Sequence, residues 1–321
     1  MKNILITGGT GFLGTALTRK LVTKGYNVTV FDNNYRGKVS RLHDIEKHFA
    51  FIKGDIRDSA SVIRACKKKD VVFHLAYING TEYFYSKPEL VLEVGVKGMT
   101  NVLDGCIKHN VPELFLASSS EVYNEPSIIP TPENVPMIIP DPLNPRFSYG
   151  GGKIISELMV INYGRKYFKR AVIFRPHNVF GPDMGGEHVI PQFTLRMKEL
   201  IEKNGSKIIF PIQGTGKETR AYIYVDDFIN GVDLLLRKGK HLEIYNIGTE
   251  METTTKELAQ KIGKILDCII TIQPGKLQPG STTKRLADIT KIKKLGFKEQ
   301  IILNEGLKKT VQWYIQSGQK E

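Results

Sequence analysis

The first half of the chain alternates short, fully apolar runs with segments whose apolar residues recur every three or four positions. The apolar runs occupy residues 4–6, 27–31, 49–52, 71–75 and 114–117. Three intervening segments have helical spacing, at residues 12–21, 61–67 and 88–109. One face of the longest segment carries Leu92, Val96, Met99, Leu103 and Ile107. Apolar strands that alternate with helices predict a parallel sheet covered on both faces, with right-handed crossovers.

The second half of the chain is less regular. A helix over 148–168 and a strand over 171–175 continue the alternation. Beyond Pro176 we expect helices at 189–203, 254–266 and 303–317 and strands at 207–211, 221–225 and 243–248. Asp226 is expected to cap the helix that follows residues 221–225. We therefore predict an α/β fold, a doubly wound parallel sheet in a first domain (1–180) with a smaller C-terminal α+β domain (181–321). Segments near 219–248 are expected to return to the first domain.

A proline-rich segment separates the fifth strand from the helix at 148–168. Seven prolines fall between residues 126 and 145, so this stretch cannot form a regular element. Long loops inside compact domains are usually functional, and we expect this one to form part of a site wall.

Composition and charge narrow the classes of function. The chain has 321 residues, of which 41% are hydrophobic and 25% charged; this excludes collagen-like, low-complexity and disordered classes. Its 46 Lys and Arg against 33 Asp and Glu give a formal net charge of +13. The basic residues are scattered, and the densest runs, 67–69 and 291–294, lie where helices are expected to end. We interpret the charge as a solvated Lys-rich surface; attraction of a small polyanionic substrate is an alternative, and no nucleic-acid partner is predicted.

The cysteines and the apolar runs bear on metal binding and location. Cys66, Cys106 and Cys268 are far apart, without a C-x-x-C motif or a Cys/His cluster, so no metal site is predicted. Buried thiols in a reducing compartment are the favoured interpretation. We find no signal-peptide pattern and no apolar run near 18 residues, so a soluble cytoplasmic protein with no membrane partner is expected.

A glycine-rich turn follows the first strand. The run Thr7-Gly8-Gly9-Thr10-Gly11-Phe12-Leu13-Gly14 lies between a strand and a helix, which is the context of a dinucleotide-binding fingerprint. Gly8 permits the tight turn, Gly11 lets the backbone approach a pyrophosphate, and Gly14 lets helix and strand pack closely. The N–H groups at the helix N-terminus favour phosphates. We therefore expect the sheet to be of the Rossmann type.

Two carboxylates follow the second and third strands. Asp32, 18 positions after Gly14, fits the acid that accepts the adenosine ribose hydroxyls, which favours NAD over NADP. Arg36 leaves NADP as an alternative cofactor. The alternative role for Asp32 is to form a turn before Asn33. Asp55 either reaches the adenine amino group or caps a helix.

A tyrosine and a lysine lie four residues apart at the start of the helix over 148–168. Tyr149 and Lys153 then share one face, and we expect the ammonium to lower the pKa of the phenol and make Tyr149 a general base. A simple surface pair is the alternative. The glycines at 150–152 each cost about 1 kcal/mol in a helix, and we interpret them as room for a flat cofactor.

Hydroxyl groups follow the fifth strand, where open α/β sheets bind ligands. Residues 118–120 are all serine, and strand-end capping is the alternative interpretation for them.

In combination these segments resemble the extended short-chain dehydrogenase/reductase family, the nucleotide-sugar epimerases and dehydratases. The resemblance covers nearly the whole chain. Its pieces are TGGTGFLG at 7–14, Asp32, GDIRD at 54–58, HLA at 74–76, SSSEVY at 118–123, YGGGK at 149–153, RPHNVFGP at 175–182 and RAYIYVDD at 220–227.

The resemblance implies an NAD-binding domain at 1–180, a nucleotide-sugar-binding domain at 181–321 and roles for individual residues. Tyr149 would be the base, Lys153 would bind the nicotinamide ribose, and Ser119 would hydrogen-bond the sugar 4-hydroxyl. NAD contacts are then expected from Gly8, Gly11, Phe12, Leu13, Gly14, Asp32, Asn33, Asp55, Ile56, Leu75, Ala76, Tyr149 and Lys153. Substrate contacts are expected from Ser119, Ser120, Asn178, Arg220 and Arg285, the last three of them at phosphates.

The family's shared first step is hydride transfer from sugar C4 to NAD⁺, after which its members diverge. Epimerases return the hydride to the other face of the ketone. Glu121 matches the base that removes the C5 proton in dehydratases, while Ser120 replaces the Asp of the glucose type. That replacement resembles GDP-mannose 4,6-dehydratases and UDP-glucuronate decarboxylases. The segment 77–81 departs from dehydratase patterns. The loop 181–188 is a candidate for recognition of the substrate's sugar, and His188 within it is interpreted as structural.

The resulting prediction is an NAD-dependent nucleotide-sugar epimerase or dehydratase of polysaccharide biosynthesis. The alternatives are a 4-dehydrogenase that stops at the 4-keto sugar, for example of a GDP-heptose, a UDP-glucuronate decarboxylase, and a non-catalytic NAD-binding regulator. Retention of Tyr149 and Lys153 disfavours the regulator. A homodimer is expected because the helices over 88–109 and 148–168 carry apolar residues on more than one face, and in relatives such a pair builds a four-helix interface.

Overall fold

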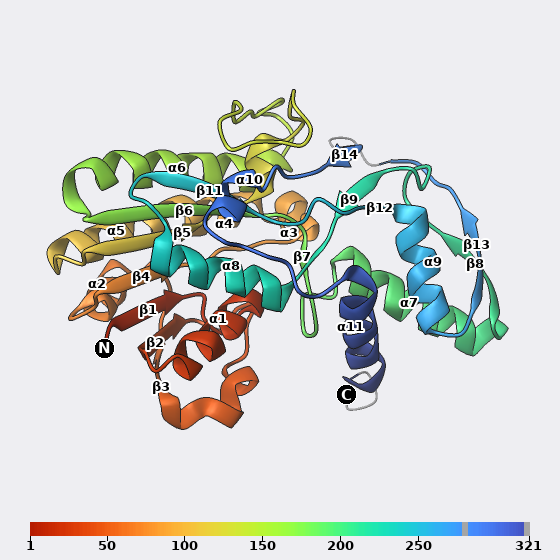
Figure 1. The fold of residues 1–321 in the computed structure, drawn as a ribbon, viewed down its shortest axis with the longest axis horizontal. Coiled ribbons are helices and arrows are strands. Elements are labelled where there is room, and N and C mark those ends of the chain that lie inside the picture. Colours follow the sequence, from red (N-terminus) through yellow and green to blue (C-terminus); the bar gives the residue numbers. More distant parts are fainter. Residues whose placement is uncertain (278–281, 318–321) are drawn as a thin grey trace.

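A computed structural model describes residues 1–277 and 282–317 (Figure 1). Within these residues the centre of the fold is a seven-stranded sheet in the order β11-β6-β5-β4-β1-β2-β3, with every neighbouring pair parallel. The strands are β1 (Asn3–Thr7), β2 (Asn27–Asp32), β3 (Phe49–Lys53), β4 (Val71–His74), β5 (Glu113–Ala117), β6 (Arg170–Pro176) and β11 (Glu243–Ile247). Because the chain winds outward from β1 in both directions, the predicted doubly wound parallel sheet is confirmed.

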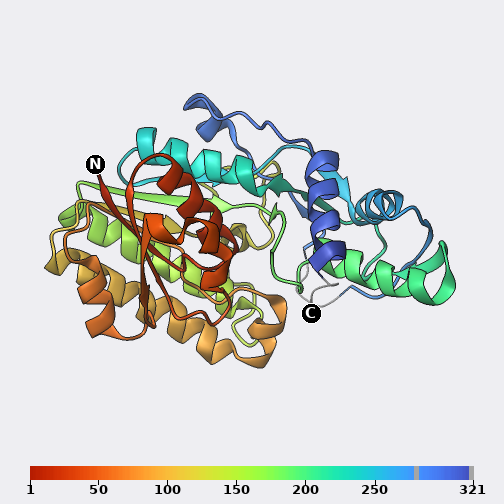
Figure 2. The same ribbon diagram turned by 90° about the horizontal axis from the view of Figure 1, so that it is seen from below.

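Helices cover both faces of the sheet (Figure 2). One face packs against α1 (Phe12–Thr23) and α8 (Val225–Lys238). The other packs against α2 (Ser59–Cys66), α5 (Gly98–Lys108) and α6 (Phe147–Tyr167). All four residues of β4 are buried, which is why the central strands are apolar throughout rather than alternating.

The helix expected over 88–109 contains a π-helical segment. It consists of α4 (Pro88–Leu92), η2 (Glu93–Lys97) and α5 in direct succession. A π turn holds more residues than an α turn, so it shifts which side chains face the sheet. Met99 and Leu103 are buried as expected, whereas Leu92 is 38% exposed and Val91 is buried in its place. The face predicted from regular spacing was therefore wrong at its N-terminal end.

A second lobe lies beside the carboxyl ends of the sheet strands (Figure 1). Its main elements are α7 (Val189–Asn204), α9 (Thr255–Ile265), α11 (Leu303–Ser317) and the parallel pair β8 (Lys207–Pro211) and β13 (Ile269–Gln273). Short strands link the lobes: β7 (Val179–Phe180), β9 (Thr219–Ala221), β10 (Ile223–Tyr224), β12 (Glu252–Thr254) and β14 (Lys284–Arg285). The remaining short elements are η1 (Val39–His48), α3 (Thr81–Ser86), η3 (Ser120–Tyr123) and α10 (Thr290–Lys294).

The strand expected at 221–225 is divided in two. Strand β9 ends at Ala221, β10 holds Ile223 and Tyr224, and α8 begins at Val225. Tyr224 occupies the N-cap position, so the prediction that Asp226 caps this helix was wrong. Asp226 lies in the first turn, where its negative charge still favours the helix dipole.

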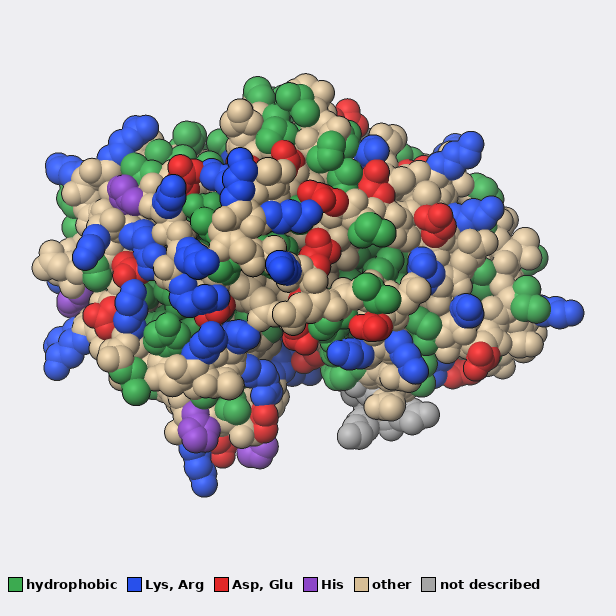
Figure 3. Space-filling view, viewed as in Figure 1, with side chains coloured by type: hydrophobic (Ala, Val, Ile, Leu, Met, Phe, Trp, Pro, Cys, Tyr) green, Lys and Arg blue, Asp and Glu red, His purple; other side chains and the backbone are tan. Residues whose placement is uncertain are grey.

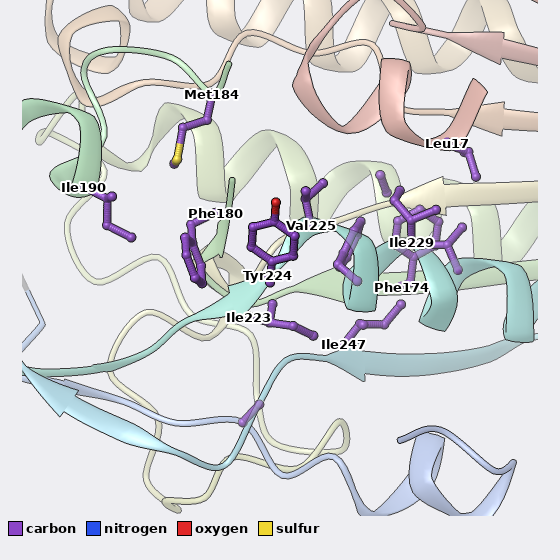
Figure 4. Close-up of a cluster of buried hydrophobic side chains, with 14 of the residues drawn as sticks. Leu17, Phe174, Phe180, Met184, Ile190, Ile223, Tyr224, Val225, Ile229 and Ile247 are labelled. Carbon is purple, nitrogen blue, oxygen red and sulfur yellow. The ribbon is translucent and has the colours of Figure 1, made fainter. Parts of the chain in front are cut away.

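One apolar cluster joins the sheet to the second lobe (Figure 4). Phe174 of β6, Phe180 of β7, Tyr224 of β10 and Ile229 of α8 belong to it, together with Met184 from the loop that leads to α7. Residues 225–247 thus return to the first layer, as expected for part of 219–248, while the division at residue 180 stays a prediction. The shared core holds the second lobe over the carboxyl edge of the sheet.

The charged surface shows no single basic patch on the face drawn in Figure 3. Lys and Arg side chains occur over both lobes, with Asp and Glu side chains between them. Among the described residues, no helix combines the length and the apolar character needed to cross a membrane.

Candidate active site

A pocket of about 480 Å³ lies at the carboxyl ends of β1, β2, β4 and β5. The sequence-predicted site residues that line it are Gly8, Gly11, Phe12, Leu13, Gly14, Asp32, Asn33, Asp55, Ile56, Leu75, Ala76, Ser119, Ser120, Glu121, Tyr149, Lys153, Asn178 and Arg285. Arg220 lies outside this lining, because its guanidinium donates to the Thr282 carbonyl at 2.8 Å. The fold therefore gathers residues from across the chain into one cavity.

The glycine-rich turn forms a cradle that fits a dinucleotide pyrophosphate. Gly8 has a left-handed φ of +73°, and a Cβ there would lie 2.6 Å from the Ala76 nitrogen. A Cβ on Gly14 would overlap the Gly8 carbonyl, whereas one on Gly11 would meet only that oxygen, at 3.4 Å. Gly11 is also the N-cap of α1 and makes no side-chain cap. Gly8 and Gly14 thus serve the turn, while Gly11 leaves room and free N–H groups at the pocket.

Asp32 both forms a turn and faces the pocket. Its two oxygens accept hydrogen bonds from the Thr10 nitrogen at 3.0 Å and the Asn34 nitrogen at 2.8 Å. Arg36, the basis for NADP as an alternative cofactor, forms an ion pair with Glu187 and lies over the Tyr83 ring. Because that pair neutralises Arg36 and Asp32 is an acid, the pocket fits a ribose with free hydroxyls better than a 2′-phosphate.

Asp55 lines the pocket as expected but does not cap a helix. Asp58 caps α2 by accepting from the Ala60 nitrogen, so the capping alternative for Asp55 was wrong. A hydrogen bond from Arg57 lowers the pKa of Asp55 to about 2. Asp55 is therefore an ionised acceptor next to Asn33, whose amide donates to it at 3.0 Å.

Tyr149 and Lys153 share one face of α6 and both line the pocket, but their pKa values differ from expectation. Burial raises the pKa of the Tyr149 phenol, and a hydrogen bond with Ser119 offsets this only in part. Burial lowers the pKa of Lys153 to about 7. The Lys153 ammonium donates to the Ala117 carbonyl at 2.7 Å rather than to the phenol. The expectation of a lowered pKa for Tyr149 is therefore wrong for this structure, because burial disfavours the charged phenolate.

The glycines at 150–152 also serve a different purpose from the predicted one. A Cβ on Gly150 would lie 3.1 Å from the Glu121 carbonyl, and one on Gly151 would lie 3.1 Å from the Ile139 side chain. A Cβ on Gly152 would overlap the hydroxyl of Tyr77. These glycines are buried against protein, so the interpretation that they admit a flat cofactor was wrong.

Ser119 and Glu121 bring a hydroxyl and a carboxylate to the pocket. Ser119 caps η3 by accepting from the Glu121 nitrogen at 3.1 Å, so its capping role coexists with its position beside Tyr149. Glu121 is ion-paired with Arg285 at 2.5 Å, and Arg146 lies 3.9 Å away. Burial acts to raise the pKa of Glu121, but these arginines and Arg220 outweigh it and lower the pKa, which keeps the carboxylate ionised.

Asn178 and Arg220, two of the three predicted phosphate contacts, differ in position. Asn178 lines the pocket and donates through its amide to the Ala221 carbonyl at 3.1 Å. Arg220 does not line the pocket, although its charge helps to lower the pKa of Glu121. A direct contact of Arg220 with substrate requires its side chain to leave Thr282.

Other residues of the site had no clear signal in the sequence. Tyr77 lines the pocket next to Lys153, and Arg146 reaches Glu121 from the end of the proline-rich loop. Tyr77 lies in the segment noted only for departing from dehydratase patterns. The proline-rich loop itself, residues 126–145, is described in full and contributes nothing to the pocket lining, so the expectation that it forms a site wall was wrong.

Comparison with known proteins identifies the family. Residues 4–248 match the model of the NAD dependent epimerase/dehydratase family. The chain is 33% identical to a putative UDP-glucose 4-epimerase from Methanocaldococcus jannaschii, covering 97% of both chains. It is 30% identical to a UDP-N-acetyl-alpha-D-glucosaminuronate decarboxylase from Bacillus cytotoxicus, covering 98% of both. It spans about half the length (48%) of a trifunctional UDP-glucose 4,6-dehydratase, 3,5-epimerase and reductase from Arabidopsis thaliana.

Solved structures agree with these matches. A UDP-glucose 4-epimerase from Thermotoga maritima, solved with UDP-glucose, has a TM-score of 0.86 at 30% identity and covers 98% of this chain and 99% of its own. A dTDP-glucose 4,6-dehydratase from Streptomyces venezuelae, solved with NAD, has a TM-score of 0.87 at 27% identity and covers 99% and 98%. The predicted family, the Rossmann-type sheet and NAD as cofactor are thereby confirmed. With its glycine cradle, its Asp32 turn and its Tyr149 and Lys153 at one pocket, this chain belongs to the NAD dependent epimerase/dehydratase family of enzymes.

Proposed function

We propose that this protein oxidises C4 of a nucleotide sugar and then completes an epimerisation or an elimination on the 4-keto sugar. The observation that carries the proposal is the convergence of Tyr149, Ser119 and Lys153 on the pocket that the glycine cradle opens into. Bound NAD supplies the hydride acceptor. Tyr149 takes the proton of the 4-hydroxyl, and Ser119 holds the same oxygen.

The electrostatics of the pocket set a condition on these roles. Burial raises the pKa of the Tyr149 phenol, so the phenol has to give up its own proton before it can accept the proton of the 4-hydroxyl. The Lys153 ammonium, with a pKa of about 7, lies 5.8 Å from the centre of the Tyr149 ring, where its positive charge favours the phenolate form of Tyr149. Asn178 and Arg285 line the same cavity, and together with Arg220 they are the proposed contacts of the diphosphate.

The test is incubation with UDP-, GDP-, CDP- and dTDP-sugars, followed by mass spectrometry and NMR of the products. Loss of water indicates a dehydratase, and loss of carbon dioxide a decarboxylase. Loss of two hydrogens indicates a 4-dehydrogenase, and an inverted C4 without a change of mass an epimerase. Binding of NAD without conversion of any sugar would favour the non-catalytic regulator.

Glu121 separates these outcomes because it is an ionised carboxylate close enough to raise the pKa of Tyr149. In a dehydratase, Glu121→Gln should still produce NADH on addition of substrate, yet form no dehydrated product, since the base for C5 is gone. In an epimerase or 4-dehydrogenase the variant should keep most of its activity. If Glu121 serves only as the structural partner of Arg285, loss of this ion pair should lower the melting temperature and leave the relative rates of the steps unchanged. Single-turnover NADH absorbance with product mass distinguishes the three.

We also propose a cytoplasmic homodimer built on α4–α6. Leu158 and Ile155 of α6 are 49% and 40% exposed, beside Leu92 at 38%, so the helices present apolar side chains that nothing in the described chain covers. Leu158→Arg should convert the dimer to a monomer by light scattering at micromolar concentration. Leu143→Arg is the matched control, because that leucine is 90% exposed on the proline-rich loop. A wild-type monomer at this concentration would refute the proposal.

A further inference from the structure

Tyr77, immediately after the Leu75-Ala76 segment, lies between the two central residues of the site. Its ring packs edge-on against the Tyr149 ring, with centroids 5.1 Å apart and planes at 85°. The Lys153 nitrogen lies 4.0 Å from the centroid of the Tyr77 ring, closer than the 5.8 Å that separates it from the Tyr149 ring. Tyr77 lines the pocket, while its hydroxyl oxygen is buried.

The buried hydroxyl occupies a space that two glycines leave open. A Cβ on Gly95, in the π-helical segment η2, would overlap the hydroxyl and the ring carbon Cζ of Tyr77. A Cβ on Gly152, in α6, would overlap the hydroxyl but lie 3.4 Å from Cζ. Among the described residues this hydroxyl has no hydrogen-bond partner, although burial of an unpaired hydroxyl is unfavourable. Its location is therefore not explained by hydrogen bonding and points to a role for the ring.

We propose that Tyr77 is a positioning residue, which holds the Lys153 ammonium on the face of its ring and fixes the Tyr149 ring by its edge. This inference rests on the proposed function, because the groups it positions are those of C4 oxidation. It assigns Gly95 and Gly152 the task of admitting the Tyr77 side chain between η2 and α6.

The surroundings of Lys153 explain why an aromatic face matters there. The lysine is buried, and it makes one hydrogen bond, to the Ala117 carbonyl, among the described residues. Glu157, one turn along α6, favours the ammonium, and the ammonium in turn disfavours protonation of His74 of β4. His74 is neutral at pH 7, since burial lowers its pKa to about 3. Cation–π attraction is strongest at such desolvated sites, so the Tyr77 ring helps the ammonium stay charged beside Tyr149.

The first test compares Tyr77→Leu with Tyr77→Phe. The phenylalanine retains the ring face, whereas the leucine retains apolar bulk without it. We expect kcat of the leucine variant to be about tenfold or more below that of the phenylalanine variant. We also expect the alkaline limb of the pH profile of kcat to move to lower pH in the leucine variant. The Lys153 ammonium loses a favourable contact there and so deprotonates at a lower pH. NADH should bind the leucine variant more weakly. The proposal would be overturned if the two variants had the same kcat, the same pH profile of kcat and the same NADH affinity.

The second test needs no substrate, so it stands apart from the proposed function. Gly152→Ala should lower the melting temperature when Tyr77 is present, because the new methyl group meets the hydroxyl. In the Tyr77→Phe background the same change should be neutral or stabilising, since Cζ is at 3.4 Å and alanine favours a helix. Gly95→Ala is the control, because Cζ still blocks it and phenylalanine should not rescue it. If Gly152→Ala has the same effect in both backgrounds, the proposed packing is wrong; if wild type converts no sugar, the proposed function fails instead.

Discussion

Replacing Tyr149 by phenylalanine is expected to slow C4 oxidation by about 10²–10⁴-fold, the range typical of losing a general base. The substitution removes the proton acceptor and retains the ring that packs against Phe84 at 4.9 Å and Tyr77 at 5.1 Å. NAD binding should therefore stay largely intact. Single-turnover NADH absorbance measures the rate, and an NADH titration measures the affinity.

Tyr167→Phe is the matched control for this substitution. Tyr167 is the last residue of the same helix and is 46% exposed, outside the pocket lining. Lys153→Ala should damage both rate and cofactor affinity, and Ser119→Ala should cost less than Tyr149→Phe because it removes a hydrogen bond rather than the base. A Tyr149→Phe enzyme that oxidises substrate at more than a tenth of the wild-type rate would exclude Tyr149 as the base.

The largest expected effect on stability comes from a buried ion pair that anchors the catalytic helix. Glu157 of α6 accepts two hydrogen bonds from Arg175 of β6, at 2.8 and 2.6 Å, and both side chains are almost completely buried. Ser118 also donates to Glu157, and Arg175 donates to the Tyr123 hydroxyl at 2.6 Å. Glu157→Gln leaves the Arg175 charge buried without a counterion, so the free energy of unfolding should fall by about 3–5 kcal/mol.

Denaturant unfolding compares this change with one at an exposed pair. Asp44→Asn removes the partner of Arg19 at a solvent-exposed ion pair and should lower the free energy of unfolding far less, because water screens the two charges. If Glu157→Gln costs no more than Asp44→Asn, the pair does not anchor α6. Because Tyr149 and Lys153 lie on that helix, a loosened α6 should also lower the NADH affinity.

The sheet and the cofactor turn could be predicted from sequence because their signals are local. The strands are continuous apolar runs bounded by helical spacing, and β4 is buried along its full length. Gly8, Gly11 and Gly14 adopt their predicted positions because the turn between β1 and α1 depends on a few adjacent residues. The strand ends then bring Ser119 and Tyr149 to the same edge as the cofactor turn.

The features that sequence reasoning missed depend on contacts between distant segments. Gly95 in η2 and Gly152 in α6 both lie against Tyr77, whose side chain enters from another strand end. The pKa of Tyr149 depends on burial, which the four-residue spacing to Lys153 does not reveal. The pairing of Glu121 with Arg285 joins positions 164 residues apart.

The central claim is that the protein removes a hydride from C4 of a nucleotide sugar. The most direct measurement is single-turnover NADH absorbance after mixing NAD-loaded protein with a reactive sugar that carries hydrogen or deuterium at C4. Our account predicts that NADH absorbance rises with the C4-protiated sugar and rises more slowly when only C4 carries deuterium. An unchanged rate with C4 deuterium, together with a slower rate when C5 alone is deuterated, would contradict oxidation at C4 as the step that Tyr149 serves.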